Sequence, residues 1–428
     1  MTQGKKPLAL LLAVLLLCGI LSVCGQTSQP VTSDTLSVQK VENLPEDFIL
    51  GMDASCVPAL EAGGVKYYDQ DGVEKDVFRI LAENGINYIR VRVWNHPYDA
   101  EGRGYGGGNC DMENALAIGL RAKEYGLKLL VDFHYSDFWA DPGKQQAPKA
   151  WQTLSLEEKS QALYEYTRTS LQKLADAGVD VGMVQIGNET NGAFCGESSS
   201  QSDGWQKICQ LMNAGAKAVR EVCPQARIVL HFTNPERAGS YEDYSAKLSY
   251  YQVDYDVFAS SYYPFWHGTL ENLTRVLSRV AETYGKQVMV AETSYPFTAE
   301  DADFHGNTVG SGNALPAYPI SQQGQADLVR DVVAAVANDT TGGVGVFYWE
   351  GTWISAGGSS YEENRALWQQ YGSGWASSYA GEYDPVDAGK WYGGCAVDNQ
   401  AFFTARGRAT EALKVFALLR TGNSVNLE

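Results

Sequence analysis

The sequence predicts an α/β protein built as a (β/α)8 barrel, the TIM-barrel fold, in a single domain. Three observations support this fold: short apolar runs alternate eight times with amphipathic stretches, glycine ends several of these stretches, and polar residues end most of the apolar runs. Strands that alternate with helices form a parallel sheet, and a closed sheet leaves no edge strand. An open doubly wound sheet is the alternative, but the segment Gly51–Ser55 at the end of the first run lacks the glycine pattern of a dinucleotide-binding turn.

The eight predicted strands are short and largely apolar. In chain order they are Phe48–Ala54, Ile86–Trp94, Lys128–Phe133, Val181–Gly187, Arg227–Phe232, Val257–Ser261, Gln287–Ala291 and Gly345–Trp349. The helices between them carry boundary signals, because Ser155 and Glu158 form a capping-box pattern and Asp111 can cap the preceding helix. Four helix ends carry a glycine, which accepts the left-handed conformation that stops a helix: Gly85, Gly126, Gly178 and Gly285.

The predicted barrel domain spans residues 47–422 and contains one long insertion. The segment Gly351–Gln400 follows the eighth strand, is rich in Gly, Ser, Tyr and Trp, and is too long for an ordinary loop. We therefore expect a functional insertion on the active face. Residues 25–46 precede the domain, and their polar, Ser- and Thr-rich beginning predicts a flexible tether.

Residues 1–24 predict an export signal. Lys5 and Lys6 precede an apolar run that is shorter than the roughly 20 residues needed to span a bilayer. Cys24 and the residues before it resemble a bacterial lipoprotein cleavage box, although Val23 departs from the small residue usual at that position. Lipid attachment at the cell surface and free secretion are both open, and either one makes the protein extracellular.

Six cysteines follow the signal region without any CxxC pair: Cys56, Cys110, Cys195, Cys209, Cys223 and Cys395. Their spacing argues against a zinc site and against thioredoxin-like chemistry. Export permits disulfides, but six cysteines allow fifteen pairings, and free buried thiols fit the sequence equally well.

The composition disfavours a nucleic-acid partner. The chain has 33 Lys and Arg against 51 Asp and Glu, and its formal net charge of −18 would repel a phosphate backbone. It also has ten Trp and twenty-five Tyr, which fit either an aromatic core or a surface on which sugars stack.

Polar and aromatic residues collect at the carboxyl ends of the predicted strands, where the active face of such a barrel lies. Glu189 follows the fourth strand and Glu292 follows the seventh. Two carboxyl groups that face each other are typical of glycosidic cleavage, in which one is a protonated acid and the other is ionised. We expect Arg90 to keep Glu292 ionised, Tyr262 to hold Glu292, and His231 to hold Glu189. The alternative for Arg90 is a buried structural ion pair, and the alternative for Tyr262 and His231 is a purely structural role in the barrel.

The predicted substrate cleft contains aromatic rings for the C–H faces of sugars and polar side chains for their hydroxyls. Asn188, beside Glu189, is a candidate partner for a sugar 2-hydroxyl. The full set of predicted substrate-binding residues is Asp53, Arg90, Trp94, His134, Asp137, Trp139, Asn188, His231, Tyr262, Trp266 and Trp349.

Five motifs together resemble glycoside hydrolase family 53. They are GMDAS at 51–55, DFHYSDFWADPGKQ at 132–145, QIGNETN at 185–191, YYPFWHG at 262–268 and AETSYP at 291–296, and the resemblance runs from about Phe48 to Leu419. The resemblance implies an endo-β-1,4-galactanase that acts on type I arabinogalactan, a pectin side chain, with retention of anomeric configuration. It also implies that Glu189 is the acid/base and Glu292 the nucleophile, and that catalysis needs no cofactor.

The same resemblance implies a structural calcium site between the loops after the seventh and eighth strands. Asp303, His305, Asn307 and Asp398 match the family pattern in order, and Cys395 stands where the pattern has Ser, so it would bind through its backbone carbonyl. Calcium prefers oxygen ligands, which makes the imidazole an atypical member of the set.

Two other functions compete with galactan cleavage. One is a retaining barrel hydrolase for another β-linked polymer, such as mannan or glucan. The other is a cell-surface glycan-binding lipoprotein without turnover, which would have little need of both glutamate motifs. We expect a monomer whose partner is its polysaccharide substrate.

Overall fold

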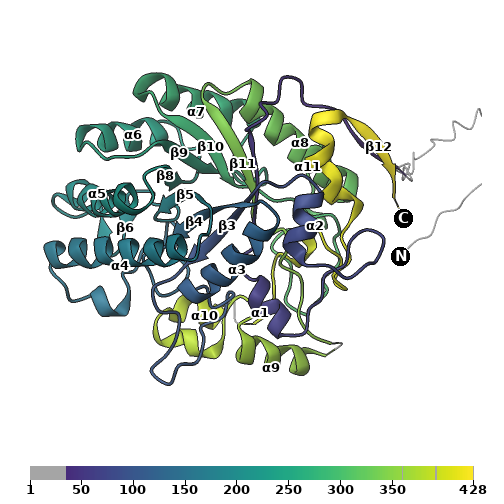
Figure 1. The fold of residues 1–428 in the computed structure, drawn as a ribbon, viewed down its shortest axis with the longest axis horizontal. Helices are drawn as coiled ribbons and strands as arrows, with labels where there is room; N and C mark the ends of the chain where they lie inside the picture. The colour runs from purple at the N-terminus through teal and green to yellow at the C-terminus, as the bar shows by residue number, and fades with distance from the viewer. Residues whose placement is uncertain (1–34, 359, 391–392, 428) are drawn as a thin grey trace, which may run out of the picture.

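The computed structural model describes residues 35–427 except 359, 391 and 392, and its centre is a closed barrel of eight parallel strands (Figure 1). Around the barrel the strands follow the order β10-β11-β2-β3-β4-β5-β8-β9. Their bounds are Ile49–Asp53 (β2), Tyr88–Val93 (β3), Lys128–Phe133 (β4), Val181–Ile186 (β5), Arg227–Phe232 (β8), Val257–Ser261 (β9), Gln287–Glu292 (β10) and Gly343–Tyr348 (β11). The predicted fold and all eight predicted strands are confirmed.

The barrel is packed on both sides of its wall because its strands are apolar on both faces. One set of strand side chains fills the interior as a separate cluster: Ile49, Leu130, Met183, Val229, Val257, Ala259, Met289, Ala291 and Phe347. Alternate residues point outward to the helices, which is the pattern expected of a parallel sheet covered by helices. The interior cluster fills the barrel, and buried polar residues such as Asp53, Asp132 and Glu292 lie at or near the carboxyl ends of the strands.

Helices surround the barrel, and the predicted boundary signals are present. Ser155 and Glu158 form the capping box of α4, Asp111 caps α3, and the four glycines that follow the predicted helices have φ between 65° and 95°. The helices are Val57–Ala62 (α1), Val77–Glu83 (α2), Met112–Glu124 (α3), Leu156–Asp176 (α4), Gly204–Val222 (α5), Ser240–Tyr250 (α6), Leu270–Tyr284 (α7), Gln322–Asn338 (α8), Tyr361–Tyr371 (α9), Pro385–Lys390 (α10) and Val415–Thr421 (α11). Among the described helices, none combines the length and apolarity needed to cross a membrane.

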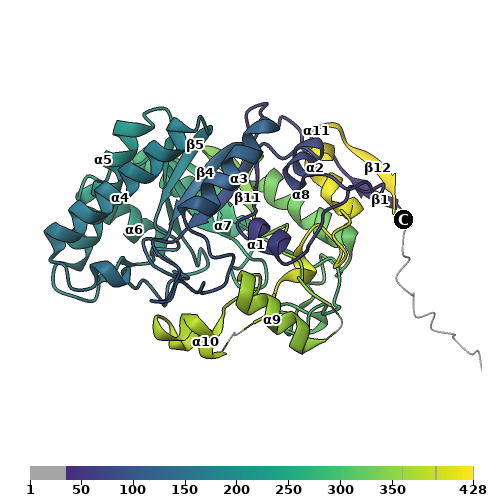
Figure 2. The same ribbon diagram turned by 60° about the horizontal axis from the view of Figure 1, so that its bottom comes forward.

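The tether prediction is wrong over the part of it that the structure describes. Thr35–Val38 (β1) pairs antiparallel with Asn423–Asn426 (β12), and both lie at the edge of the molecule away from α4 and α5 (Figures 1 and 2). Leu36 and Val38 are buried, so this segment belongs to the folded domain. The domain therefore extends beyond the predicted limits of 47 and 422 at both ends. The predicted signal and the cleavage box lie outside the described residues.

The insertion after β11 folds over one end of the barrel, where α9 lies close to α1 (Figure 2). Its side chains form a second apolar cluster with the loops after β3 and β4, in which Trp353 stacks on Trp139 and Tyr383 stacks on Tyr105. Two further short strands, Ala193–Phe194 (β6) and Glu197–Ser198 (β7), form a hairpin after β5. The six cysteines that follow the predicted signal region are all free thiols, and five of them are buried.

Candidate active site

Glu189 and Glu292 stand at the carboxyl ends of β5 and β10. Glu292 is the last residue of its strand and is 6% exposed. Glu189 comes three residues after the end of β5 and has a φ of 48°, a left-handed conformation that few non-glycine residues adopt. The two carboxyls are close enough for the charge of Glu292 to raise the pKa of Glu189. The structure therefore brings together the two carboxyls that the sequence singled out.

Glu292 is held by one cation and one hydroxyl. Arg90 Nη1 lies 2.9 Å from Glu292 Oε1, and the Tyr263 hydroxyl donates to Glu292 Oε2 over 2.8 Å. Burial raises the pKa of Glu292, whereas Arg90 and the Tyr263 hydroxyl act in the opposite direction because both stabilise the anion. The expected Arg90 contact is present. The expectation for Tyr262 is wrong, because its hydroxyl donates to the Gly268 carbonyl.

Glu189 lies in an environment that favours its protonated form. Burial, followed by the charge of Glu292, raises its pKa to about 8. The Ser261 hydroxyl donates to Glu189 Oε1 over 2.6 Å, and His231 Nε2 lies 2.9 Å from the same hydroxyl oxygen. His231 therefore acts on the carboxyl through Ser261, which the sequence had not indicated.

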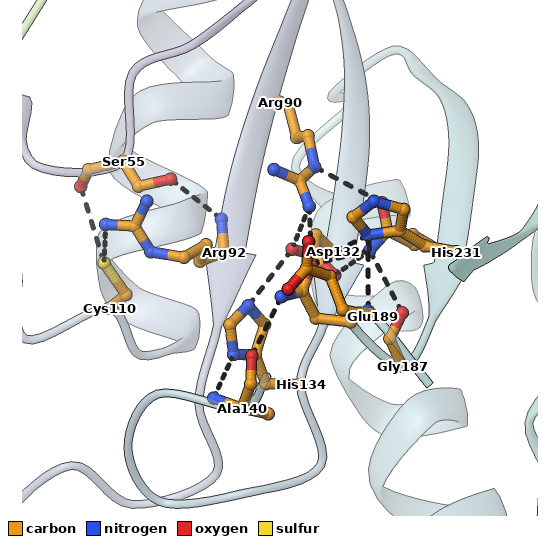
Figure 3. Close-up of polar contacts among 12 residues, drawn as sticks. Ser55, Arg90, Arg92, Cys110, Asp132, His134, Ala140, Gly187, Glu189 and His231 are labelled. Atoms are coloured by element: carbon orange, nitrogen blue, oxygen red, sulfur yellow. Dashed lines mark hydrogen bonds and ion pairs between the residues drawn. The ribbon is translucent and has the colours of Figure 1, made fainter. Parts of the chain in front are cut away.

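Arg90 is the centre of a buried polar network (Figure 3). Its guanidinium contacts Asp53 Oδ2 at 3.1 Å, Asp132 Oδ2 at 2.8 Å and Asn188 Oδ1 at 2.8 Å. His134 Nε2 lies 3.2 Å from Asp132 Oδ2. The other ring nitrogen of His134 accepts hydrogen bonds from Trp94 Nε1 and from a backbone amide, which leaves the imidazole neutral with its proton on Nε2. The network thus fixes the Arg90 guanidinium that contacts Glu292.

Several predicted substrate contacts prove to lie behind the cleft surface. Asp53, Arg90, Trp94, His134, His231 and Tyr262 are almost completely buried among protein groups. Asp137 is also buried, and its two carboxylate oxygens accept the backbone N–H groups of His96 and Lys149. These residues were predicted as sugar contacts because the sequence shows only that they follow strands. In the structure they hold the loops in place and form the Arg90 network that surrounds the two glutamates.

Aromatic rings border the glutamates. Trp139 and Trp375 stack with ring centroids 4.3 Å apart, and Trp353 lies parallel to Trp375. Trp349, at the end of β11, and Trp375 are partly exposed, whereas Trp266 is 50% exposed and its ring packs against Tyr263. Trp375 was missed from the sequence because it lies in the insertion, far along the chain from any predicted strand.

A neutral acid and a partly stabilised anion, surrounded by aromatic rings, are the parts that glycosidic cleavage needs. A family model, described as glycosyl hydrolase family 53, matches residues 49–416 of the chain. The chain belongs to glycosyl hydrolase family 53. It is therefore a glycoside hydrolase, and the family predicted from the motifs is confirmed.

Named relatives resemble most of the chain. An endo-beta-1,4-galactanase of Bacillus subtilis (strain 168) is 59% identical over 393 residues, which cover 91% of this chain and 90% of that protein. An arabinogalactan endo-beta-1,4-galactanase of Cellvibrio japonicus is 35% identical, with 79% of this chain and 86% of that protein covered. The solved family 53 catalytic domain of Ignisphaera aggregans has a TM-score of 0.79 and 39% identity, with 90% of this chain and 99% of that domain covered.

A second group of acidic residues in this family 53 chain lies beside the insertion. The carboxylates of Asp301, Asp303 and Asp398 converge so that one oxygen of each lies within 4.8 Å of the others. Asp303 Oδ2 accepts the backbone N–H of Cys395 at 2.5 Å. Asp398 Oδ1 is buried without a hydrogen-bond partner among the described residues.

Burial raises the pKa of Asp303 to about 7, and burial together with Asp303 raises that of Asp398 to about 8. Asn307 Oδ1 likewise has no hydrogen-bond partner within the described chain, and its amide nitrogen donates to the Glu300 carbonyl. The imidazole of His305 is not one of the three converging groups, and the backbone N–H of His305 donates to Asp303. Asp301 was not predicted, because a single Asp in a polar loop is indistinguishable from a solvated one.

Proposed function

We propose that the protein hydrolyses β-1,4-galactosidic linkages within (arabino)galactan chains by a retaining double displacement. The observation that carries this proposal is the pairing of Glu189, whose pKa is raised to about 8 by burial and by Glu292, with a Glu292 that contacts Arg90 and Tyr263. The names of the Bacillus and Cellvibrio relatives supply the substrate class. The exposed aromatic rings support attack within a chain, because flat rings along an open surface can bind successive sugars.

In the first step, Glu292 attacks the anomeric carbon while Glu189 donates its proton to the departing oxygen. The C–O bond to the leaving chain breaks and a covalent galactosyl–Glu292 bond forms. The raised pKa of Glu189 keeps this proton available near neutral pH. Arg90 and the Tyr263 hydroxyl hold the attacking carboxylate, and their contacts weaken as its charge passes into the new bond.

In the second step, Glu189 is ionised and removes a proton from an incoming water. The water oxygen bonds to the anomeric carbon, the bond to Glu292 breaks, and Glu189 regains its proton. Departure of the covalent product restores the negative charge beside Arg90. Two inversions at one carbon give overall retention.

The acidic group beside the insertion is proposed as a structural calcium site, and its residues fit that ion. Asp303, Asp398 and Asn307 offer oxygen atoms, two of which are buried and lack hydrogen-bond donors in the described part of the chain. A cation would also relieve the repulsion among Asp301, Asp303 and Asp398. The proposed ligands include His305 and the Cys395 carbonyl on the strength of the family resemblance. The site would join the loop after β10 to the insertion and takes no part in bond cleavage.

Export is proposed from the sequence of residues 1–24, which lie outside the described residues. The basic residues, the apolar run and Cys24 support either a secreted protein or a lipid-anchored one. An extracellular location suits an enzyme whose substrate is a polymer too large to enter the cell.

The substrate proposal is tested by incubating the purified protein with linear galactan, mannan and glucan and separating the products by size. We expect short galacto-oligosaccharides early in the reaction and no product from mannan or glucan. Galactose as the sole product, or cleavage of another polymer alone, would contradict endo-galactanase action. Products from none of the three would leave a glycan-binding protein as the remaining function.

A further inference from the structure

Arg92 and Glu350 form a buried pair beside the active site that the mechanism above does not use. Arg92 Nη1 contacts Glu350 Oε1 and lies 3.4 Å from Asp53 Oδ1. The other Asp53 oxygen lies 3.1 Å from Arg90 Nη1, which in turn contacts Glu292. Asp53 therefore connects Glu350 and Arg92 on one side to Arg90 and Glu292 on the other.

The Arg92 guanidinium is fixed in place by its surroundings. Its Nη2 donates to the Gly107 carbonyl over 3.2 Å and lies 3.3 Å from Cys56 Sγ, and the contacts of Arg92 with Ser55 and Cys110 are drawn in Figure 3. The Trp139 ring covers the guanidinium, with 4.4 Å between its carbon and the ring centroid. The Arg92 guanidinium therefore cannot shift if Asp53 moves. The position of Asp53 depends on its contacts with other groups.

Glu350 shows a sign of holding a proton. Its Oε2 is buried and has no hydrogen-bond partner among the described residues, whereas its Oε1 and Asp53 Oδ1 both lie against Arg92 Nη1. A proton between these two carboxyls would satisfy that oxygen. The backbone at Glu350 has a φ of 48°, a left-handed conformation that few non-glycine residues adopt.

A count of buried charges leads to the same conclusion. Four carboxyl groups contact the Arg90 and Arg92 guanidiniums: Asp53, Asp132, Glu292 and Glu350. His134 is neutral, as shown above, so two positive charges face four carboxyls. Buried charges that lack partners are costly, so at least one of these carboxyls is expected to be protonated.

We propose that Glu350 is a positioning residue, held as a neutral carboxylic acid that accepts from Arg92 and donates a hydrogen bond to Asp53. This hydrogen bond holds Asp53 in contact with Arg90, and Asp53 in turn holds Arg90 in contact with Oε1 of Glu292, the nucleophile. The inference rests on the proposed function, because it concerns the nucleophile of that reaction. Burial, with Asp53 adding to it, raises the pKa of Glu350 to about 8, which agrees with the neutral form at neutral pH.

Apart from Asp53, the titratable groups that face Arg92 and Glu350 are thiols and a phenol in their neutral forms. The thiols of Cys56, Cys110 and Cys395 and the phenol of Tyr67 surround Glu350 and Arg92, and burial raises the pKa of all four. A change of pH between 5 and 8 therefore acts on Glu350 and not on these neighbours.

The test compares Glu350→Gln with Glu350→Ala. The Gln amide can accept from Arg92 and donate to Asp53 as the neutral acid does, whereas Ala removes both contacts. We expect Gln to keep kcat on galactan within about threefold of the wild type and Ala to lower kcat by tenfold or more, with KM nearly unchanged in both. Equal loss in both variants would show that the anion is needed and would overturn the proposal. Full activity in both would also overturn it, because no positioning would be required.

A second readout does not depend on catalysis. The pKa of Glu350 is higher in the folded chain than in the unfolded one, so its stabilising contribution is present below about pH 4.5 and is lost as pH rises toward 8. Glu350→Gln should therefore gain in melting temperature relative to the wild type between pH 5 and pH 8. Glu197→Gln, which removes a carboxylate paired with Lys159 Nζ at 2.7 Å, should show no such gain. If the difference in melting temperature between Glu350→Gln and the wild type is the same at pH 5 and at pH 8, Glu350 is not held as a neutral acid. If the wild type does not cleave galactan, the proposed function fails while this stability test still applies.

Discussion

The Tyr263 hydroxyl donates to Glu292 Oε2 over 2.8 Å, on the side of the carboxylate opposite to Arg90. Its neighbour Tyr262 donates instead to the Gly268 carbonyl. Two adjacent tyrosines thus provide a matched pair of variants. Tyr263→Phe should raise the pKa of Glu292, because a hydrogen bond that stabilises the anion is lost.

We expect Tyr263→Phe to lower kcat on galactan by about 10- to 100-fold and to move the acid limb of kcat/KM to higher pH. Tyr262→Phe should leave the acid limb in place. The measurement is the pH profile of both variants between pH 4 and pH 7. The same shift in both variants would show that the phenol acts on the fold of the loop and not on Glu292.

The alkaline limb of the wild-type profile should report Glu189. Because the first step needs its proton, activity should fall as pH rises through about 8. The Ser261 hydrogen bond lowers the pKa of this carboxyl, so Ser261→Ala should move the alkaline limb to higher pH by up to about one unit and should lower kcat about tenfold. Ser245→Ala removes a buried hydroxyl of α6 and serves as the control. An alkaline limb that stays in place in Ser261→Ala would argue against Glu189 as its source.

Removal of calcium should destabilise the protein without changing the chemistry of cleavage. If the free ion is at about 100 times its Kd, binding contributes about 2.7 kcal/mol, and excess chelator should lower the melting temperature by several degrees. Asp398→Asn should abolish this dependence, because it removes one of three converging carboxylates. Identical melting curves with calcium and with chelator would count against the site.

The partly exposed Trp349 should contribute to polymer binding. Trp349→Ala should raise KM on galactan about tenfold or more, because a sugar loses its stacking surface, while the melting temperature changes little. Trp205, which packs on Tyr244, offers a control substitution on a helix of the outer ring. An unchanged KM in Trp349→Ala would show that the Trp349 ring does not bind the substrate.

The barrel could be predicted because its signals are local. Each strand is a short apolar run, several helix ends carry a capping side chain or a glycine, and the two glutamates lie at or within three residues of strand ends. The pairing of β1 with β12 could not be predicted in this way, because Thr35–Val38 and Asn423–Asn426 are short and lie at opposite ends of the chain. Their pairing depends on a closed barrel that brings both ends together.

The details of the site were less predictable than its location. Strand periodicity ends at Ser261, so the sequence could not decide which of Tyr262 and Tyr263 turns toward Glu292. Trp94 was predicted as a stacking surface, but it is completely buried and Phe138 and Trp139 of the loop after β4 pack on its ring. Asp132 and Gln185 were missed as members of the Arg90 network, although a polar residue within an apolar strand is a usable signal for such a role.

The assignment of Glu292 as the nucleophile can be tested by trapping the covalent intermediate. A 2-deoxy-2-fluoro-β-galactobioside with a dinitrophenyl leaving group should form the galactosyl–enzyme quickly and release it slowly. After digestion, mass spectrometry should find the label on Glu292, and Glu292→Gln should remain folded, unlabelled and inactive. A label on Glu189 or on any other residue, or wild-type-like turnover by folded Glu292→Gln, would contradict the assignment.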